Sequence, residues 1–419
     1  MILRTRNIIE QIRQGEIPKG YIRTVSGISP TDWKRYTFGD IYTERKEPGS
    51  EELPLLMVSI HSGVSDGEVD EEDLPKKVKR IEDKSQYKKA VSGDLVFNMM
   101  RAWQGAIGTV RTTGMVSPAY IVAKPNDEVY PLFMDYYTRT PQMINQIDRQ
   151  SYGVTDFRKR LYWDSFIPIA CTLPSIEEQR KIAAILTTQD KVIELKEKRL
   201  GEKQRQKKYL MQQLLTGKKR LPGFSGEWKK VKIGSFIKEI DERSTVNNQY
   251  EILSVTKNGM VFQSSHFNKQ IASENNVGYK VVRRGNLAFS TMNLWMGSLD
   301  TLRICDIGIV SPAYKVFEFN QSLIVVNFAE NYMKSAEMIW LYKANSEQGA
   351  SIVRRNLDLQ ALLNSEVALP DISEQNAIAE VLSAADREIG LLRQDIEQEK
   401  QKKKALMQLL LTGIVRVKI

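Results

Sequence analysis

The stretch "LPSIEEQRKIAAILTTQDKVIELKEKRL" at Leu173–Leu200 decides the fold, because the chain repeats it as "LPDISEQNAIAEVLSAADREIGLLRQDI" at Leu369–Ile396. When the ungapped alignment is continued to Gly217 and Gly413, 20 of 45 positions are identical. Identity at this level, at a constant offset of 196 residues, indicates an internal duplication. The chain is therefore expected to contain two copies of one structural unit.

Each copy carries the start and stop signals of one long helix. Ser175 precedes Glu178 by three positions, and Asp371 precedes Glu374 in the same way, which is the capping-box pattern at a helix start. A glycine closes each copy, where a left-handed residue can end a helix. These signals bracket about 41 residues, so we expect a rod of ~60 Å at ~1.5 Å per residue.

Apolar residues along both helices follow the 4,3 spacing of a coiled-coil seam. The seam positions are Ile182, Leu186, Ile193, Leu200, Leu210 and Leu214 in the first copy, and Ile378, Leu382, Ala385, Ile389, Leu392, Ile396, Leu406 and Leu410 in the second. Polar residues interrupt the first seam at Gln189, Lys196, Lys203 and Lys207, so this helix is too weak to stand alone. Because a globular segment separates the helices, we expect them to pair antiparallel. The alternative is two surface helices that share only their ancestry.

The globular segments before the helices repeat more faintly. "GDLVFNMMRAWQGAIG" from Gly93 corresponds to "GNLAFSTMNLWMGSLD" from Gly285, and "VSPAY" occurs at both Val116 and Val310. The matching letters are apolar residues and glycines in a strand-like pattern, whereas the polar loops differ. The sequence thus predicts an α+β fold, in which two globular domains of mixed sheet and helix alternate with two long helices in a pseudo-two-fold arrangement. A tryptophan beside a glycine, as at Trp103 and Trp295, favours a core position over base stacking.

The charge pattern favours a polyanionic partner. The chain has 61 Lys+Arg against 51 Asp+Glu, a formal net charge of +10. Basic clusters precede both helices at matched positions, in "DFRKRL" (Arg158, Lys159, Arg160) and "VRRNL" (Arg354, Arg355). Such clusters are either phosphate contacts or a solvated face, and the matched placement gives the two interpretations equal weight. The acidic run at residues 66–73 is expected to face solvent.

Several kinds of chemistry have no motif in this sequence. Two cysteines (Cys171, Cys305) and two histidines (His61, His266), all far apart, argue against a disulfide framework and a zinc site, and fit the cytoplasm. We find no G-x-x-x-x-G-K-[ST] loop, no N-P-P-Y methyltransferase signature and no G-x-S-x-G elbow. We also find no signal peptide or membrane span. The pattern indicates a recognition protein without catalytic residues.

These motifs together resemble one known family. The doubled "LPSIEEQ" entry and "LMQQLLTG" exit of the helices, with "MRAWQGAIG" and "VSPAY", resemble the DNA-specificity subunits of type I restriction-modification enzymes over nearly the whole chain. The resemblance implies two target-recognition domains that each read one half of a bipartite, asymmetric DNA site. It also implies that the helices set the spacing and dock two methyltransferase subunits, which restriction-translocase subunits join for cleavage. S-adenosylmethionine, ATP and Mg would then belong to the partner subunits, and this chain would bind no cofactor and no membrane.

The corresponding domain boundaries are an N-terminal extension at residues 1–30, recognition domains at 31–172 and 218–368, and spacer helices at 173–217 and 369–419, the last with a tail. The extension's "QIRQGEIPKGYI" resembles the helix exit "QQLLTGKKRLPGF", so we expect it to pack where the second helix ends and to complete a ring. The predicted DNA contacts are Arg101, Gln104, Arg158, Lys159, Arg160, Asn293, Arg354, Arg355 and Asn356. The predicted spacer and partner-docking residues are Glu178, Gln179, Ile182, Leu186, Leu210, Leu214, Glu374, Gln375, Ile378, Leu382, Leu406 and Leu410.

Two other functions remain open from the sequence. One is a stand-alone nuclease or methyltransferase with an unrecognised motif. The other is a coiled-coil adaptor protein without sequence-specific DNA binding.

Overall fold

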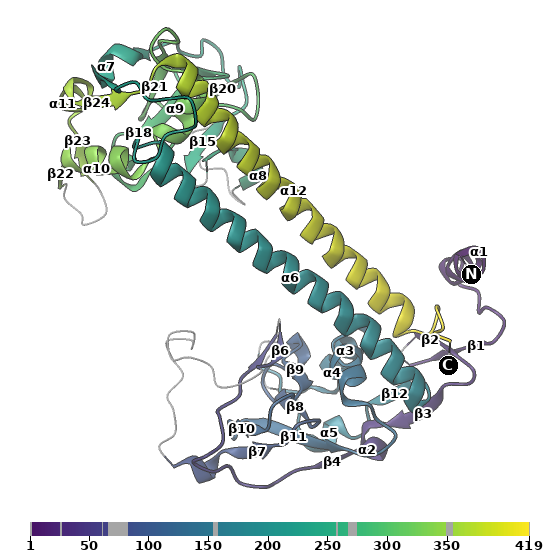
Figure 1. The fold of residues 1–419 in the computed structure, drawn as a ribbon. Coiled ribbons are helices and arrows are strands. Elements are labelled where there is room, and N and C mark those ends of the chain that lie inside the picture. The colour runs from purple at the N-terminus through teal and green to yellow at the C-terminus, as the bar shows by residue number, and fades with distance from the viewer. Residues whose placement is uncertain are drawn as a thin grey trace. The chain divides into compact units, whose positions relative to one another are not determined.

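A computed structural model describes residues 2–25, 27–60, 62–65, 83–153, 158–256, 259–266, 275–348 and 355–418. The chain forms two compact units, which are unit 1 (Met1–Lys196 with Asp395–Ile419) and unit 2 (Glu197–Gln394). Two helices of 39 residues, α6 (Ile176–Leu214) and α12 (Ile372–Leu410), each contribute one part to unit 1 and the other to unit 2 (Figure 1). The acidic run at 66–73 and the predicted contact Arg354 lie outside the described residues.

Unit 1 is built on a four-stranded antiparallel sheet. The strand order is β4 (Tyr42–Glu44), β11 (Tyr120–Pro125), β8 (Leu95–Asn98) and β9 (Ile107–Thr109). The two-stranded ladders are β1 (Tyr21–Thr24) with β2 (Gly27–Pro30), β3 (Lys34–Thr37) with β12 (Ala170–Leu173), β5 (Val58–Ser59) with β6 (Gly63–Val64), and β7 (Lys88–Ala90) with β10 (Gly114–Val116). The helices are α1 (Ile2–Arg13), α2 (Phe38–Ile41), α3 (Pro131–Tyr137), α4 (Pro141–Gln150) and α5 (Trp163–Phe166), with 3-10 turns η2 (Lys84–Gln86) and η3 (Ala102–Gln104).

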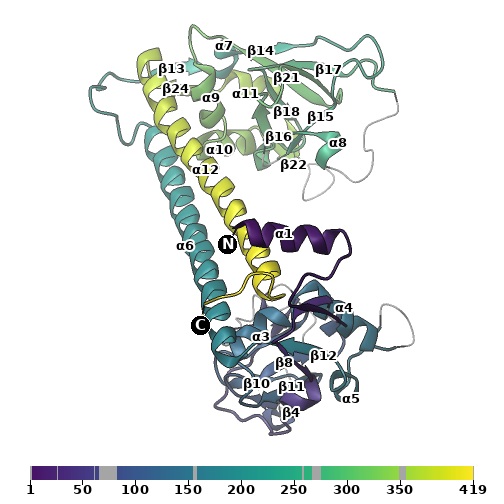
Figure 2. The same cartoon turned by 90° about the vertical axis from the view of Figure 1, so that its right-hand side faces the viewer.

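Unit 2 repeats this plan (Figure 2). Its sheet has the equivalent order β14 (Ile237–Ile240), β21 (Tyr314–Phe319), β18 (Leu287–Ser290) and β19 (Leu299–Thr301). The ladders are β13 (Lys229–Lys232) with β24 (Glu366–Leu369), β15 (Leu253–Thr256) with β16 (Gly259–Phe262), β17 (Lys280–Arg283) with β20 (Ile307–Val310), and β22 (Ser346–Gln348) with β23 (Arg355–Leu357). The helices are α7 (Ile233–Phe236), α8 (Gln263–His266), α9 (Val326–Tyr332), α10 (Ala336–Ala344) and α11 (Leu359–Asn364), with the 3-10 turn η4 (Leu294–Met296).

Both faces of each central sheet are covered, which explains the continuous apolar runs in the sequence. In β8, Leu95 and Phe97 join the main core of unit 1, while Val96 joins a second cluster on the other face. In β18, Leu287 and Phe289 join the main core of unit 2, while Ala288 joins a second cluster on the other face. A strand buried on both faces reads as an unbroken apolar run rather than as an alternation.

The long helices pack against each other antiparallel, as predicted (Figures 1 and 2). In unit 1, Ile182 and Leu186 share a core with Leu410, and Lys403 pairs with Asp190 at 2.5 Å. In unit 2, Ile378 and Leu382 share a core with Leu214, and Lys207 pairs with Asp386 at 2.6 Å. The two ion pairs are equivalent under the 196-residue repeat. The predicted α+β fold with two paired long helices is therefore confirmed.

The helix ends follow the sequence signals. The side chains of Ser175 and Asp371 accept hydrogen bonds from the backbone N–H groups of Glu178 (3.3 Å) and Glu374 (2.9 Å). At the other ends, Gly217 has φ 67° and Gly413 has φ 71°, the left-handed conformation that glycine adopts without strain.

The polar residues that interrupt the first seam have partners in α12. The Lys196 Nζ lies 2.8 Å from Asp395 and 2.9 Å from Glu399, and Gln189 donates to Glu399 at 2.6 Å. The hydrogen bond from Gln189, followed by that from Lys196, lowers the pKa of Glu399 from its ordinary 4.5 to about 2. The seam of unit 1 is thus polar at this point but paired.

In the described ranges, no helix combines the length and apolar character needed to cross a membrane. Nor does any group of three or more His, Cys, Asp or Glu side chains in the described part of the chain form a set suited to a metal ion.

Candidate nucleic-acid interface

A short turn after the central strand presents the first group of predicted contacts. In unit 1, Arg101 caps η3 with φ −134° and ψ 6°, and Gly105 ends the turn with φ 104°. In unit 2, Asn293 caps η4 with φ −121° and ψ 3°, and Gly297 ends it with φ 80°. The two backbones therefore form the same turn, and each needs a glycine at its left-handed end.

The second group of predicted contacts lies against the tryptophan of each turn. The Lys159 ammonium is 5.8 Å from the centre of the Trp103 ring, and the Arg355 guanidinium is 5.3 Å from that of Trp295. Both distances suit a cation–π contact. Both tryptophans are half-buried, so each ring serves as a platform between the core and the surface. The structure thus brings together residues about 60 positions apart, at equivalent places in the two units.

In unit 1 these groups line an open cavity of about 1270 Å³. The lining residues are Ile60, Met100, Arg101, Trp103, Gln104, Tyr152, Gly153, Arg158, Lys159, Arg160 and Tyr162. Five of the predicted contacts are among them. Sequence reasoning missed Tyr152 and Tyr162, whose exposed rings lie 5.3 Å apart on the cavity wall. No motif marks these tyrosines, because only the bridge between Tyr152 and Arg160 brings them to the site.

The arginines of this cavity differ from two arginines elsewhere in unit 1, Arg45 and Arg139. Arg45 and Arg139 pair with Asp94 (2.7 Å) and Asp135 (3.0 Å). By contrast, no carboxylate among the described residues lies within 4.0 Å of the guanidinium groups of these cavity residues: Arg101, Arg158 and Arg160. Unpaired guanidinium groups beside aromatic rings suit an anionic ligand with planar bases.

Lys159 has a different environment from its neighbours. Its ammonium forms an ion pair with Asp148 at 2.8 Å in addition to its contact with Trp103. In unit 2, the Arg355 guanidinium donates to the Ser346 carbonyl at 3.3 Å. Both cations therefore hold their loop against the tryptophan, and this internal role weakens the interpretation of Lys159 as a phosphate contact.

The glutamates at the helix starts are buried and form ion pairs with arginines. Both oxygens of Glu178 accept hydrogen bonds from Arg416 at 2.8 Å, and Arg416 also contacts Asp32 at 2.8 Å. In unit 2, Arg220 donates to both oxygens of Glu374 at 2.5 Å. Since each glutamate is only 1% exposed, a partner cannot reach it. The capping-box glutamate thus pairs with an arginine that follows the end of the other long helix.

The adjacent glutamines are equally internal. Gln179 accepts from the Tyr130 N–H (2.8 Å) and donates to the Glu128 carbonyl (2.9 Å). Gln375 accepts from the Val325 N–H (2.8 Å) and donates to the carbonyl of Leu323 (2.9 Å). The side chains of these glutamates and glutamines thus fasten each helix to its own domain, and the docking role expected for them stays a prediction.

The apolar residues among the predicted spacer and partner-docking residues differ in how far they are buried. Six are buried inside the units, and two are half-buried. The buried ones are Ile182, Leu186, Leu214, Ile378, Leu382 and Leu410, and the half-buried ones are Leu210 and Leu406. These positions form the spacer's interior, so a partner would have to use other residues.

Sequence reasoning missed Arg220 and Arg416. Each follows the terminal glycine of its helix by three positions, so the 196-residue offset between them was the available signal. Nothing in the surrounding letters, which otherwise differ, indicates that these arginines pair with a buried glutamate.

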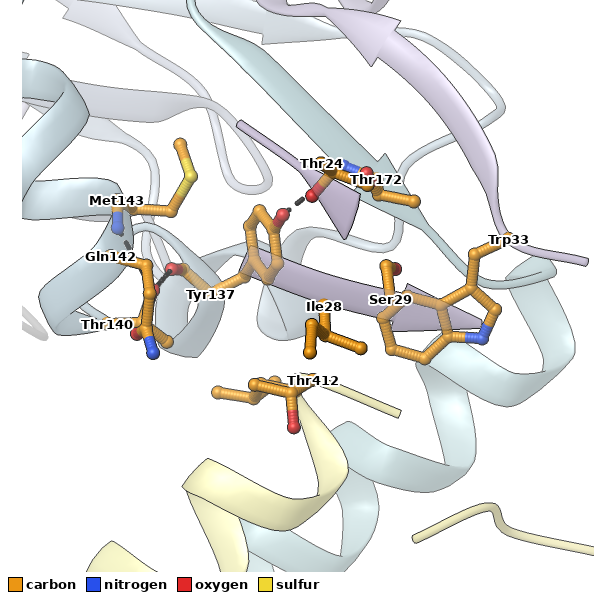
Figure 3. Close-up of a pocket in the computed structure, with 11 residues that line it drawn as sticks. Thr24, Ile28, Ser29, Trp33, Tyr137, Thr140, Gln142, Met143, Thr172 and Thr412 are labelled. Atoms are coloured by element: carbon orange, nitrogen blue, oxygen red, sulfur yellow. Dashed lines mark hydrogen bonds between the residues drawn. The ribbon is translucent and has the colours of Figure 1, made fainter. Parts of the chain in front are cut away.

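The N-terminal extension contacts the exit of α12 in unit 1. The Tyr21 hydroxyl donates to the Gly413 carbonyl at 2.9 Å. A cavity of about 30 Å³ is lined by residues of the extension and by the end of α12, among them Ser29 of β2, Trp33, Tyr137 and Thr412. Figure 3 shows these lining residues. The volume of this cavity is that of about one water molecule, so it cannot hold a substrate.

No protein-family model matches this sequence. The chain is 24% identical over 432 residues to the type I restriction enzyme MjaVIII specificity subunit of Methanocaldococcus jannaschii, and the match covers 93% of this chain and 94% of that protein. It is 26% identical over 267 residues to the putative type I restriction enzyme MjaX specificity subunit of the same organism, covering 59% of each.

A solved chain from a study of "complex assembly and conformational transition of the type I R-M system" has the same fold, with a TM-score of 0.54 at 17% identity. That match covers 92% of this chain and 99% of the solved one. Over nearly its whole length the chain is thus similar to a type I restriction enzyme specificity subunit, and it shares the fold of the solved chain.

Proposed function

We propose that this chain is the DNA-binding specificity subunit of a type I restriction-modification complex, with each unit reading one half of a bipartite, asymmetric site. The observation that carries the proposal is the open cavity of unit 1, where unpaired arginines, a glutamine and exposed tyrosines converge on a turn that unit 2 repeats. Backbone phosphates provide affinity, and base edges provide sequence selection.

The paired helices act as the spacer between the two reading units. Each has 39 residues, which corresponds to ~58 Å at ~1.5 Å per residue, or nearly two DNA turns of ~34 Å. The Glu178–Arg416 and Glu374–Arg220 ion pairs support this role, because they fix where each helix leaves its domain.

The helices also dock two methyltransferase subunits. Leu195 of α6 and Leu391 of α12 occupy equivalent positions, and their side chains are 56% and 66% exposed. An exposed leucine retained in both copies, where most exposed neighbours differ, is expected if each copy binds the same partner. Restriction-translocase subunits complete the complex. S-adenosylmethionine, ATP and Mg are used by these partners.

Band shifts with the assembled complex test the proposal. The wild-type complex should select a bipartite sequence from random duplex. Arg158→Ala should weaken binding to all sequences and reduce the slope of log affinity against log salt by about 0.9, the value for one phosphate contact. Lys159→Ala should change this slope less, since Lys159 is already paired with Asp148. Arg35→Ala, in the exposed part of β3, is the matched control and should leave the slope unchanged.

Two results would contradict the proposal. An adaptor protein would assemble with its partners but select no sequence. A stand-alone enzyme would turn over S-adenosylmethionine or cleave DNA as an isolated chain.

A further inference from the structure

The two turns that end the central strands share one frame but carry different side chains. The frame consists of a methionine, the tryptophan platform with its cation, and the left-handed glycine. Its members are Met100, Trp103, Gly105 and Lys159 in unit 1, and Met292, Trp295, Gly297 and Arg355 in unit 2. Because backbone and platform are the same in both units, a difference in side chain at one position means a difference in what that position can contact.

Two positions on this frame change from arginine to asparagine. Arg101 in unit 1 corresponds to Asn293 in unit 2, and both cap their turn with nearly the same dihedral angles. Arg160 corresponds to Asn356, since Tyr152 pairs with Arg160 as Glu347 pairs with Asn356. Arg101, Arg160 and Asn356 are exposed, and Asn293 is half-buried.

The pattern of change separates phosphate contacts from base contacts. The DNA backbone carries the same charge at every sequence, so a contact that neutralises a phosphate charge has to stay cationic in both copies. Residue 158 and its counterpart 354 are both arginine, which meets this condition. An asparagine carries no charge that could neutralise a phosphate, so the pairs of positions 101/293 and 160/356 do not meet this condition. A residue that reads a base, by contrast, has to change when the half-site changes.

The two side-chain types fit different bases. The guanidinium fork donates two parallel hydrogen bonds to the O6 and N7 acceptors of guanine. The asparagine amide donates to N7 and accepts from the N6 amino group of adenine. The neighbouring side chains also differ between the units. Tyr152 and Tyr162 in unit 1 correspond to Glu347 and Asp358 in unit 2, so aromatic rings are replaced by carboxylates.

We infer that Arg101 and Arg160 read guanines in the half-site of unit 1, and that Asn293 and Asn356 read adenines at the equivalent places in the half-site of unit 2. This inference rests on the proposed function. It assigns specificity to four residues, and it moves Arg160 from the phosphate contacts to the base contacts.

Site mapping with exchanged residues tests the inference. The complex with its methyltransferase subunits would be assembled with Arg101→Asn, and selected sites would be read from a randomised duplex library. One guanine of the first half-site should change to adenine, with a five- to roughly hundredfold change in preference, as a bidentate contact gives. The second half-site and the spacing should stay as in the wild type.

Three further variants make the result decisive. Asn293→Arg should cause the converse change, adenine to guanine, in the other half-site. Arg101→Lys should keep guanine but bind it more weakly, since lysine also reaches O6 and N7. Arg35→Asn makes the same chemical change on β3 and should leave the selected site intact. The Asn293→Arg result also keeps the test valid if Arg101→Asn impairs folding.

The outcomes separate the inference from the proposed function. If Arg101→Asn only weakens binding to all sequences and lowers the salt slope by about one, position 101 contacts phosphate and the inference is wrong. If the wild-type complex selects no bipartite sequence, the proposed function itself fails.

Discussion

In each unit, a single arginine pairs with the buried glutamate at the start of a long helix. Arg416 connects the buried Glu178 at the start of α6 with Asp32 just before β3, while its guanidinium lies 6.0 Å from the centre of the Trp33 ring. A carboxylate that is 1% exposed requires such a partner, because water cannot solvate it. The charge of Glu178 is thus tolerated only because Arg416, more than 200 positions away in the sequence, pairs with it.

We predict that Arg416→Ala destabilises unit 1 by about 3 kcal/mol. The variant leaves the Glu178 carboxylate buried and unpaired, which costs roughly 3–5 kcal/mol in buried pairs, and the partial exposure of Arg416 puts the loss at the lower end. Urea denaturation followed by circular dichroism would measure the change.

Two variants serve as controls for that measurement. The double variant Glu178→Gln, Arg416→Met removes both charges and should lose less than Arg416→Ala alone. Lys418→Ala removes an exposed cation from the same tail and should change stability by less than about 0.5 kcal/mol. Equal losses for the single and double variants would mean that the ion pair is not what Arg416 provides.

At the scale of elements, the two long helices end in the same conformation but in different surroundings. A Cβ on Gly413 would lie 2.4 Å from Pro30 and 3.0 Å from Trp33, whereas one on Gly217 would lie 3.4 Å or more from Trp228. The N-terminal extension causes this difference, since it supplies Pro30.

Gly413→Ala should therefore destabilise the protein more than Gly217→Ala. Both replacements carry the backbone cost of a left-handed alanine, about 1–2 kcal/mol, because φ is nearly equal at the two sites. Only Gly413→Ala adds a steric clash with Pro30. Thermal melting of the two variants side by side would test this order, and an equal loss would show that the extension does not press on the helix exit.

The polar part of the seam predicts a pH dependence. The pKa of Glu399 is lowered to about 2 in the folded chain, so the carboxylate contributes stability above its ordinary pKa of 4.5. This contribution is lost as the pH falls from about 4.5 through about 2, as Glu399 takes up a proton and releases Gln189 and Lys196. Melting temperatures across this window would show the loss. Glu399→Gln should flatten this part of the profile, and an unchanged profile would rule out Glu399 as its source.

At the scale of the whole molecule, the duplicated letters predicted the fold because many of them are residues whose side chains are buried in the cores. Leu186 and Leu382 point into cores, and the glycines at 217 and 413 adopt the conformation that their position in the repeat implies. The same letters did not predict that Glu178 is buried. A charged residue in the first turn of a helix is normally exposed, and only the folded chain shows that Arg416 covers it.

The candidate site was less predictable, for a physical reason. The basic cluster at residues 158–160 could be read as a patch, but whether each cation is free or paired depends on side chains far away in sequence. Asp148 binds Lys159, whereas the described residues offer Arg158 no carboxylate. The predicted contacts in unit 2, Asn293 and Asn356, stay predictions.

The spacer role gives a prediction for the whole chain. Four residues would be inserted into both helices, after Glu197 in α6 and after Gln394 in α12, so that Lys196 keeps its partner Asp395. Each helix lengthens by ~6 Å with a rotation of ~40°. Both half-sites should be retained, with about one or two more unread base pairs between them at ~3.4 Å each.

Mapping the methylated sites of the assembled complex would measure this spacing. Insertion of the same four residues after Gly223 is the control and should leave the spacing unchanged, because a Cβ added to this glycine would meet no atom within 4 Å. An active complex with longer helices and the original spacing would show that the helices do not set the distance.

The division of unit 1 between two stretches of chain has a consequence for biosynthesis. Residues 395–418 belong to unit 1, yet they leave the ribosome after all of unit 2. At roughly 5–20 residues per second, about 12–48 s pass between the synthesis of Glu178 and that of Arg416. Unit 1 is therefore the first unit to be started and the last to be completed. During translation, Glu178 has no Arg416 to pair with, while unit 2 can already fold.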